Sequence, residues 1–159
     1  GIAALRYLND QDVRDAVANG EISPDLLLST LVRLGYPDEP GTTAFFLSRA
    51  EELVGYQLIY RDGLQITHLR IPKVVSNWVA AVRTAGGNIR SCQVATGGIT
   101  NFYHNFAILD ARIDEFFRSH QPPSPVLRTH LVAGALQLAL QAQQQNGQWV
   151  ETPSLAVAY

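Results

Sequence analysis

The sequence predicts a mainly α-helical fold, with about six helices in an orthogonal bundle, a small β-hairpin and an extended C-terminal tail. Three observations support this class. Apolar residues recur at helical spacing between capping residues and glycines, one Asp-Gly turn joins two short apolar runs, and an apolar stretch follows Gly147. The 159 residues fit a single domain covering residues 1–159.

Each predicted helix is bounded by a capping residue, a proline in its first turn or a glycine after its end. The six helices are expected at about residues 10–18, 24–34, 43–54, 72–84, 100–119 and 125–145. The fifth has the most regular apolar face, formed by Phe102, Phe106, Leu109, Ile113 and Phe116. The sixth is apolar on most sides, which is typical of a helix that is central to the core or sandwiched between subunits.

A hairpin is predicted from residues 56–60 and 64–71, which flank the turn Arg61-Asp62-Gly63. Two short strands are marginal alone, so the hairpin must pack on helices or on a neighbouring subunit. Residues 88–96 fit either a short strand or a broken helix. The tail, residues 148–159, is apolar enough to require cover, either as a segment pinned to its own domain or as a C-terminal arm on a neighbour.

Charge is distributed unevenly along the chain. Residues 64–109 contain no acid and four bases, whereas both flanking segments are acidic. Such a stretch would suit a polyanion, and it would equally suit a weakly charged face or subunit interface. If it is a nucleic-acid site, its contacts are Arg70, Lys73, Arg83 and Arg90. Trp78 lies within this stretch, where it could stack on a base or pack between helices.

Catalytic and metal-binding patterns are not found in the sequence, so no catalytic residue, metal site or cofactor is predicted. Cys92 and His104 form a formal Cys/His pair, but a lone cysteine is typically a small buried apolar residue. Asp110 and Asp114 lie one helical turn apart, as expected for an exposed charged face. No apolar run is long enough to span a membrane, so no membrane partner is expected.

One segment resembles a helix in the coat proteins of flexible filamentous plant viruses, the potexvirus-like group, where the helix precedes an arginine that contributes to the RNA-binding groove. The similarity lies in Val79-Ala80-Ala81-Val82-Arg83-Thr84-Ala85-Gly86, followed by Ile89-Arg90. Leu34-Gly35-Tyr36-Pro37-Asp38 upstream and Phe106-Ala107-Ile108-Leu109-Asp110 downstream extend it over about residues 27–117. The aromatic run that follows the arginine in that family is replaced here by Ser91 to Gly98, and its Asp-Phe-Phe signature is missing. The resemblance implies a helical capsid, subunits joined by terminal arms, and RNA bound without sequence preference.

The expected function is therefore that of a structural assembly protein, a viral coat or nucleocapsid-type subunit that self-associates and binds single-stranded RNA. Its tail and hairpin are predicted to mediate assembly. The alternative is a helical protein–protein interaction module of a larger polypeptide, and neither is an enzyme. A viral subunit would be found in the virion or the host cytoplasm, and the alternative would be an intracellular soluble protein.

Overall fold

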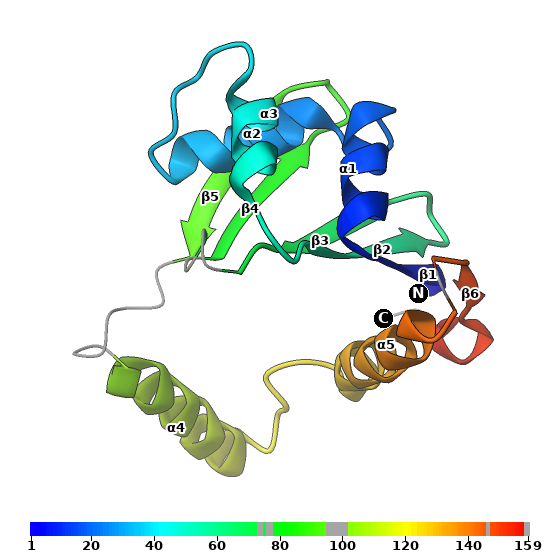
Figure 1. Cartoon of the computed structure of the whole chain (residues 1–159). Helices are drawn as coiled ribbons and strands as arrows, with labels where there is room; N and C mark the ends of the chain where they lie inside the picture. Colours follow the sequence, from blue (N-terminus) through cyan, green and yellow to red (C-terminus); the bar gives the residue numbers. More distant parts are fainter. Residues whose placement is uncertain (73–74, 76–77, 95–101, 146, 158–159) are drawn as a thin grey trace.

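The computed structural model describes residues 1–72, 75, 78–94, 102–145 and 147–157. Its fold is α+β, with two antiparallel sheets packed against helices (Figure 1). The prediction of a mainly α-helical bundle with one small hairpin is therefore wrong. Strands form where a helix is predicted, where the sequence fits either a strand or a helix, and at the N-terminus, for which no element is predicted.

The larger sheet has four strands in the order β3-β2-β1-β6. These are β1 (Ile2–Leu8), β2 (Val54–Tyr60), β3 (Gln65–Arg70) and β6 (Val150–Glu151). The predicted hairpin is confirmed as β2 and β3, and Gly63 has the positive φ of 89° that its turn requires. Its support comes from β1 of the same chain, which pairs with β2 along its length.

The large sheet lies between two helical layers. On one face lie α1 (Asp10–Ala18), α2 (Pro24–Arg33) and α3 (Thr42–Arg49), and on the other lies α5 (Val126–Gln143) (Figure 1). Each face has its own apolar cluster. The cluster under α1–α3 contains Leu31 and Phe46, whereas the cluster under α5 contains Ile2, Leu131 and Leu155.

The predicted capping residues explain why the first two helices begin where they do. Asn9 and Asp12 form a capping box at the start of α1, in which each side chain accepts a hydrogen bond from the other's backbone N–H at 3.1 Å. The side-chain oxygen of Ser23 accepts from the backbone N–H of Leu26 at the start of α2. The third helix ends at Arg49, earlier than predicted, because the chain must extend before it enters β2.

The helix predicted over residues 72–84 is wrong, because β4 (Trp78–Arg83) pairs with β5 (Ile89–Val94) in a second, two-stranded sheet. The turn between them contains Gly87 with φ of 83°. One face of this sheet packs against α2, which provides the cover that a two-stranded sheet needs. Residues 88–96 fit either a short strand or a broken helix from the sequence, and the structure shows a strand over residues 89–94.

The last two predicted helices are confirmed as α4 (Phe102–Ser119) and α5. In Figure 1 α4 projects away from the sheets, and it forms no extended contact with any other helix or strand of the described residues. Residues 120–125 connect α4 to α5 and contain Pro122, Pro123 and Pro125. His120 has a positive φ of 56° at the start of this connection.

The C-terminal tail packs on its own domain. Glu151 and Val150 pair with Ala4 and Leu5 of β1, which places β6 at one edge of the large sheet. The side-chain hydroxyl of Thr152 donates a hydrogen bond of 2.9 Å to the carbonyl of Ile2. A short 3-10 helix, Pro153–Leu155, then buries Leu155 against α5. The structure thus favours a pinned tail over an arm laid on a neighbour.

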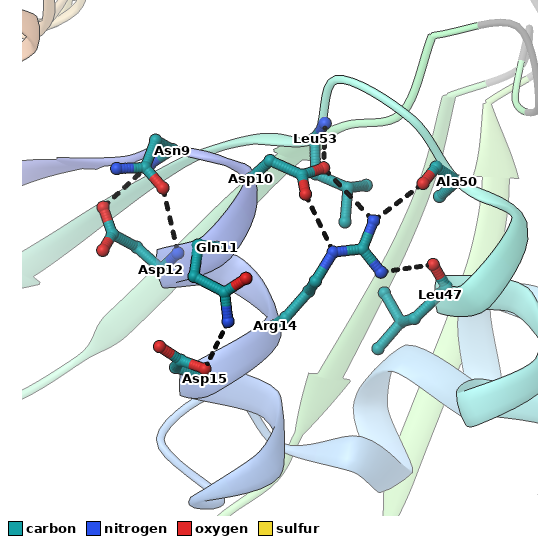
Figure 2. Close-up of polar contacts among 9 residues, drawn as sticks. All are labelled: Asn9, Asp10, Gln11, Asp12, Arg14, Asp15, Leu47, Ala50 and Leu53. Atoms are coloured by element: carbon teal, nitrogen blue, oxygen red, sulfur yellow. Dashed lines mark hydrogen bonds and ion pairs between the residues drawn. The ribbon is translucent and has the colours of Figure 1, made fainter.

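Arg14 joins α1 to the end of α3, and Asp10 joins α1 to the segment before β2 (Figure 2). Its guanidinium donates hydrogen bonds to the carbonyls of Leu47 and Ala50 at 2.6 and 2.8 Å, and to the carboxylate of Asp10 at 2.8 Å. Asp10 also accepts from the backbone N–H of Leu53 at 2.9 Å. The hydrogen bond from Arg14 lowers the pKa of Asp10, whereas partial burial raises it by a smaller amount.

Replacing Asp10 by alanine is expected to lower the free energy of unfolding at neutral pH by about 1–3 kcal/mol, because Arg14 and Leu53 each lose a hydrogen-bond partner. The pKa of Asp10 is depressed in the folded chain, so its contribution is present above its ordinary value of 3.8 and declines as pH falls through the folded pKa. Denaturant unfolding of Asp10→Ala at pH 7 and pH 3 measures this difference. The matched variant Asp114→Ala breaks only an exposed pair with Arg118 and should cost at most about 0.5 kcal/mol.

Candidate assembly and nucleic-acid surfaces

The first exposed apolar surface lies along α4. We define the α4 stripe as Leu109, Ile113, Phe116 and Phe117, all of which are exposed. They share one side of the helix because their spacing follows the helical repeat. The rest of the helix surface carries ion pairs between Arg112 and Glu115 at 2.8 Å and between Arg118 and Asp114 at 3.0 Å. This is the pattern of an amphipathic helix, and the described helices and strands form no extended contact with its apolar side.

The second exposed apolar surface is the outward side of α5. Leu131 and Ala142 face the large sheet and are buried. We define the α5 stripe as Val132, Leu136 and Leu140, which lie on the other side of the helix and are each more than half exposed. A shallow hollow of about 420 Å³ runs beside this helix, lined by residues that include His130, Gln137 and Leu155. A helix that is apolar on most sides is expected to be covered on more than one of them. The described residues cover α5 on the side that faces the large sheet and leave the α5 stripe exposed.

The total accessible surface is large for the mass of the chain. It measures 10880 Å² for 17.5 kDa. A compact monomer of that mass should expose about 7,900 Å². The excess of about 3,000 Å² exceeds the roughly 1,600 Å² that a standard protein–protein interface removes from both partners together. An isolated chain therefore leaves more surface in water than its size requires.

A row of rings crosses the large sheet and continues onto the β4–β5 sheet. We call Tyr7, Tyr56, His68 and Trp78 the aromatic row. Successive ring centroids are 5.5, 6.4 and 6.2 Å apart. Gln143 of α5 donates a hydrogen bond to the Tyr56 hydroxyl, whereas His68 is exposed and Trp78 is 61% exposed. Packing of Trp78 inside a helix bundle is therefore excluded.

The four predicted nucleic-acid contacts do not form one group. Arg70 ends β3 and lies on the same face as His68, two residues earlier. Lys73 lies outside the described residues. Arg90 pairs with Val82 in the register of β4 and β5, so it faces the same side as Trp78, whereas Arg83 faces the opposite side.

Arg83 is held against α2 rather than presented outward. Its guanidinium donates to the hydroxyl of Ser23 at 3.1 Å and pairs with the carboxylate of Asp25 at 3.3 Å. Ser23 and Asp25 lie at the start of α2, which packs on this face of the β4–β5 sheet. The structure thus brings Arg70, His68 and Trp78 onto one connected surface with Arg90 further along it, and separates Arg83 from them.

The aromatic row was missed by the sequence reading because its members come from four strands. Part of it could have been predicted from the sequence. In a strand, residues two apart share a face, so His68 and Arg70 are expected on the same face of the predicted hairpin. The role of Trp78 was hidden by the helical interpretation of its segment. The pairing of β4 with β5 places the Trp78 side chain on the exposed face of that sheet.

Cys92 and the pair Asp110 and Asp114 are the remaining candidate groups that the structure describes, and all three residues lie at the surface. Cys92 is exposed, so the expectation of a buried thiol is wrong, and the side chain of His104 lies outside the described residues. Asp110 and Asp114 are exposed, as predicted for a charged helix face. Among the described residues no three potential ligands gather as a metal site. No helix in the described part of the chain has the length and hydropathy to cross a membrane.

Comparison with known proteins finds no matching family model, no matching curated protein and no matching solved structure. The resemblance to filamentous-virus coat proteins therefore stays a prediction. One of its components is changed by the fold, since the segment compared with a helix of that family is β4 and the turn that follows it.

Proposed function

We propose that this chain is a structural assembly subunit, of the coat or nucleocapsid kind, that self-associates and binds single-stranded RNA without sequence preference. The observation that carries the proposal is the outward apolar surface of α4 and α5, together with the excess of about 3,000 Å² of accessible area. Exposed apolar side chains that gather on one face are typical of interaction sites in soluble proteins. Self-association would remove them from water.

The surfaces used for assembly differ from those expected from the sequence. The tail and the β2–β3 hairpin both obtain their cover from β1 and α5 of the same chain. Among their described residues, neither has an exposed apolar face comparable with the α4 stripe. We therefore assign self-association to α4 and α5 in place of the tail and the hairpin.

RNA binding rests on the exposed part of the aromatic row and the bases beside it. Nucleobases stack on exposed aromatic rings whatever their identity, and arginines contact the phosphates between them. Trp78 and His68 offer rings about 6.2 Å apart, and Arg70 lies two residues from His68 on the same strand face. Such a surface suits single strands, whose bases are free to stack.

Binding of fluorescent single-stranded RNA homopolymers at several salt concentrations tests the RNA part of the proposal. Trp78→Ala is expected to weaken binding by about 5- to 150-fold, which corresponds to the 1–3 kcal/mol of one stacked base. Arg90→Ala should weaken binding and make the salt dependence shallower, because one phosphate contact is lost. Uridine and adenosine polymers should bind within a few-fold of each other.

Arg83→Ala provides the matched control, since Arg83 faces α2 and pairs with Asp25. It should leave RNA affinity nearly unchanged. Binding that is insensitive to salt, or equal losses for Arg83→Ala and Arg90→Ala, would contradict the proposed surface.

A second candidate function, an interaction module of a larger polypeptide, is favoured by the same α4 stripe, which could dock on a different protein. The two functions differ in what the purified chain does alone. Light scattering over a range of concentrations, with and without RNA, is expected to reveal assemblies well above 17.5 kDa. A chain that stays monomeric and ignores RNA at low salt would refute the assembly function.

A further inference from the structure

We infer that the α4 stripe of one copy docks on the α5 stripe of a second copy, so that α4 is the donated element and α5 the acceptor. This inference rests on the proposed self-association and names the surfaces that carry it. The occupant of each stripe is thus another copy of this chain.

The two stripes match in length, spacing and chemistry. Both helices have 18 residues, so each is roughly 27 Å long. Leu109, Ile113 and Phe116 follow a spacing of four and three residues, and the α5 stripe follows a spacing of four. Ridges formed by residues four apart on one helix fit between such ridges on another.

The two helices differ in overall charge. Asp110 and Arg112 flank the α4 stripe on its two sides, and α4 bears three acids against two bases. Arg128 flanks the α5 stripe, and α5 contains no acid. A third exposed apolar surface is formed by Trp78, Val82 and Val94 on one face of the β4–β5 sheet. Arg90 lies among these residues, so this surface is a poorer match for a purely apolar stripe.

The connection between the helices disfavours docking of α4 on α5 of its own chain. Each proline in residues 120–125 fixes its own φ and holds the preceding residue in an extended conformation. Gln121, Pro122 and Ser124 each precede a proline, so most of this connection is stiff and extended. It directs α4 away from the domain, where Figure 1 shows it. Exchange of such an element between copies is a common route to association.

The accessible area is sufficient for this arrangement. Donor and acceptor surfaces are different, so each copy takes part in two contacts, one through α4 and one through α5. Two interfaces of standard size would remove about 1,600 Å² from each copy, which is within the excess of about 3,000 Å². Such head-to-tail contacts build rings or open chains of subunits.

Three single substitutions test the docking by light scattering of the full chain. Ile113→Lys places a charge in the α4 stripe, and Leu136→Lys places one in the α5 stripe. Each is expected to raise the concentration for half-assembly by at least about tenfold, since a buried unpaired charge opposes the contact. Ala111→Lys adds the same charge to the opposite side of α4 and should assemble like the unmodified chain. All three positions are solvent-exposed, and far-UV circular dichroism verifies that the fold is kept.

Mixing the two defective variants gives the decisive result. Ile113→Lys retains an intact acceptor and Leu136→Lys retains an intact donor, so their equimolar mixture should form a dimer that neither variant forms alone. If the unmodified chain assembles but the mixture stays monomeric, the docking of α4 on α5 is wrong while the assembly function stands. If the unmodified chain never assembles, the proposed function itself fails.

Discussion

Phe46→Ala is expected to lower the free energy of unfolding by about 3–5 kcal/mol, the cost of a large cavity in a packed core. Phe46 is 1% exposed and meets the ring of Tyr36 edge-on, with centroids 5.4 Å apart. It lies at the centre of the cluster that joins α2 and α3 to the sheet. Urea or guanidinium unfolding monitored by circular dichroism measures the loss.

The neighbouring residue provides an internal control. Phe45 is 54% exposed and its ring lies under the guanidinium of Arg49 at 4.9 Å. Phe45→Ala should cost no more than about 1 kcal/mol, because only an exposed cation–π contact and a little packing are lost. Similar losses for the two phenylalanines would mean that the cluster is not organised around Phe46.

Leu155→Ala is expected to destabilise the chain by about 2–5 kcal/mol, because the side chain fills the space between the tail and α5. Leu155 is 1% exposed, and a methyl group added at Gly134 of α5 would lie 2.3 Å from one of its terminal carbons. For a chain of this size the loss corresponds to a fall in Tm of about 2–4 °C per kcal/mol.

Leu64→Ala is the matched control, since Leu64 follows the hairpin turn and is 49% exposed. Thermal unfolding should separate the two variants clearly. If Leu155→Ala left stability unchanged but abolished self-association, the tail would act as an arm on a neighbouring copy, which is the alternative that we set aside.

Local signals in the sequence predicted most helices of the structure. Ser23 with Pro24, Gly35 and the turn at Asp62-Gly63 act within a few residues, so their effect can be predicted without the fold. The same holds for α4 and α5, whose apolar residues recur over many turns. Their exposure could not be predicted, because a periodic pattern identifies an apolar face but not what covers it.

The strands that were missed have non-local causes. The buried residues of β1 are Ile2, Leu5 and Leu8, a spacing of three that hides the alternation expected of a strand. A bulge between Ile2 and Ala4 puts Ile2 and Leu5 on one face of the sheet, whereas Leu8 is buried on the other face, in the cluster under α1–α3. In β4, Val79 and Val82 also fit a helical repeat, and only pairing with β5 and packing on α2 decide between helix and strand.

The sequence predicted which segment carries the candidate nucleic-acid contacts. It did not predict which of their side chains share a face. Arg70 and Arg90 lie on the face that carries His68 and Trp78, whereas strand alternation turns Arg83 toward Asp25. Charge composition is a property of a segment, and which side chains share a face depends on the register of pairing. The aromatic row depends further on contact between two sheets, which no local pattern specifies.

The pairing of β6 with β1 has a consequence for how the chain reaches its native state. The hydrogen bond from Thr152 to Ile2 spans 150 positions of sequence, so the first strand acquires its second neighbour only when the two ends of the described chain meet. Closing so long a loop costs conformational entropy before any contact compensates for it. We therefore expect the three strands β1, β2 and β3 to form an early kinetic unit, with closure by β6 as a late step. Until that step, the unfinished edge of β1 is open to strands of other molecules.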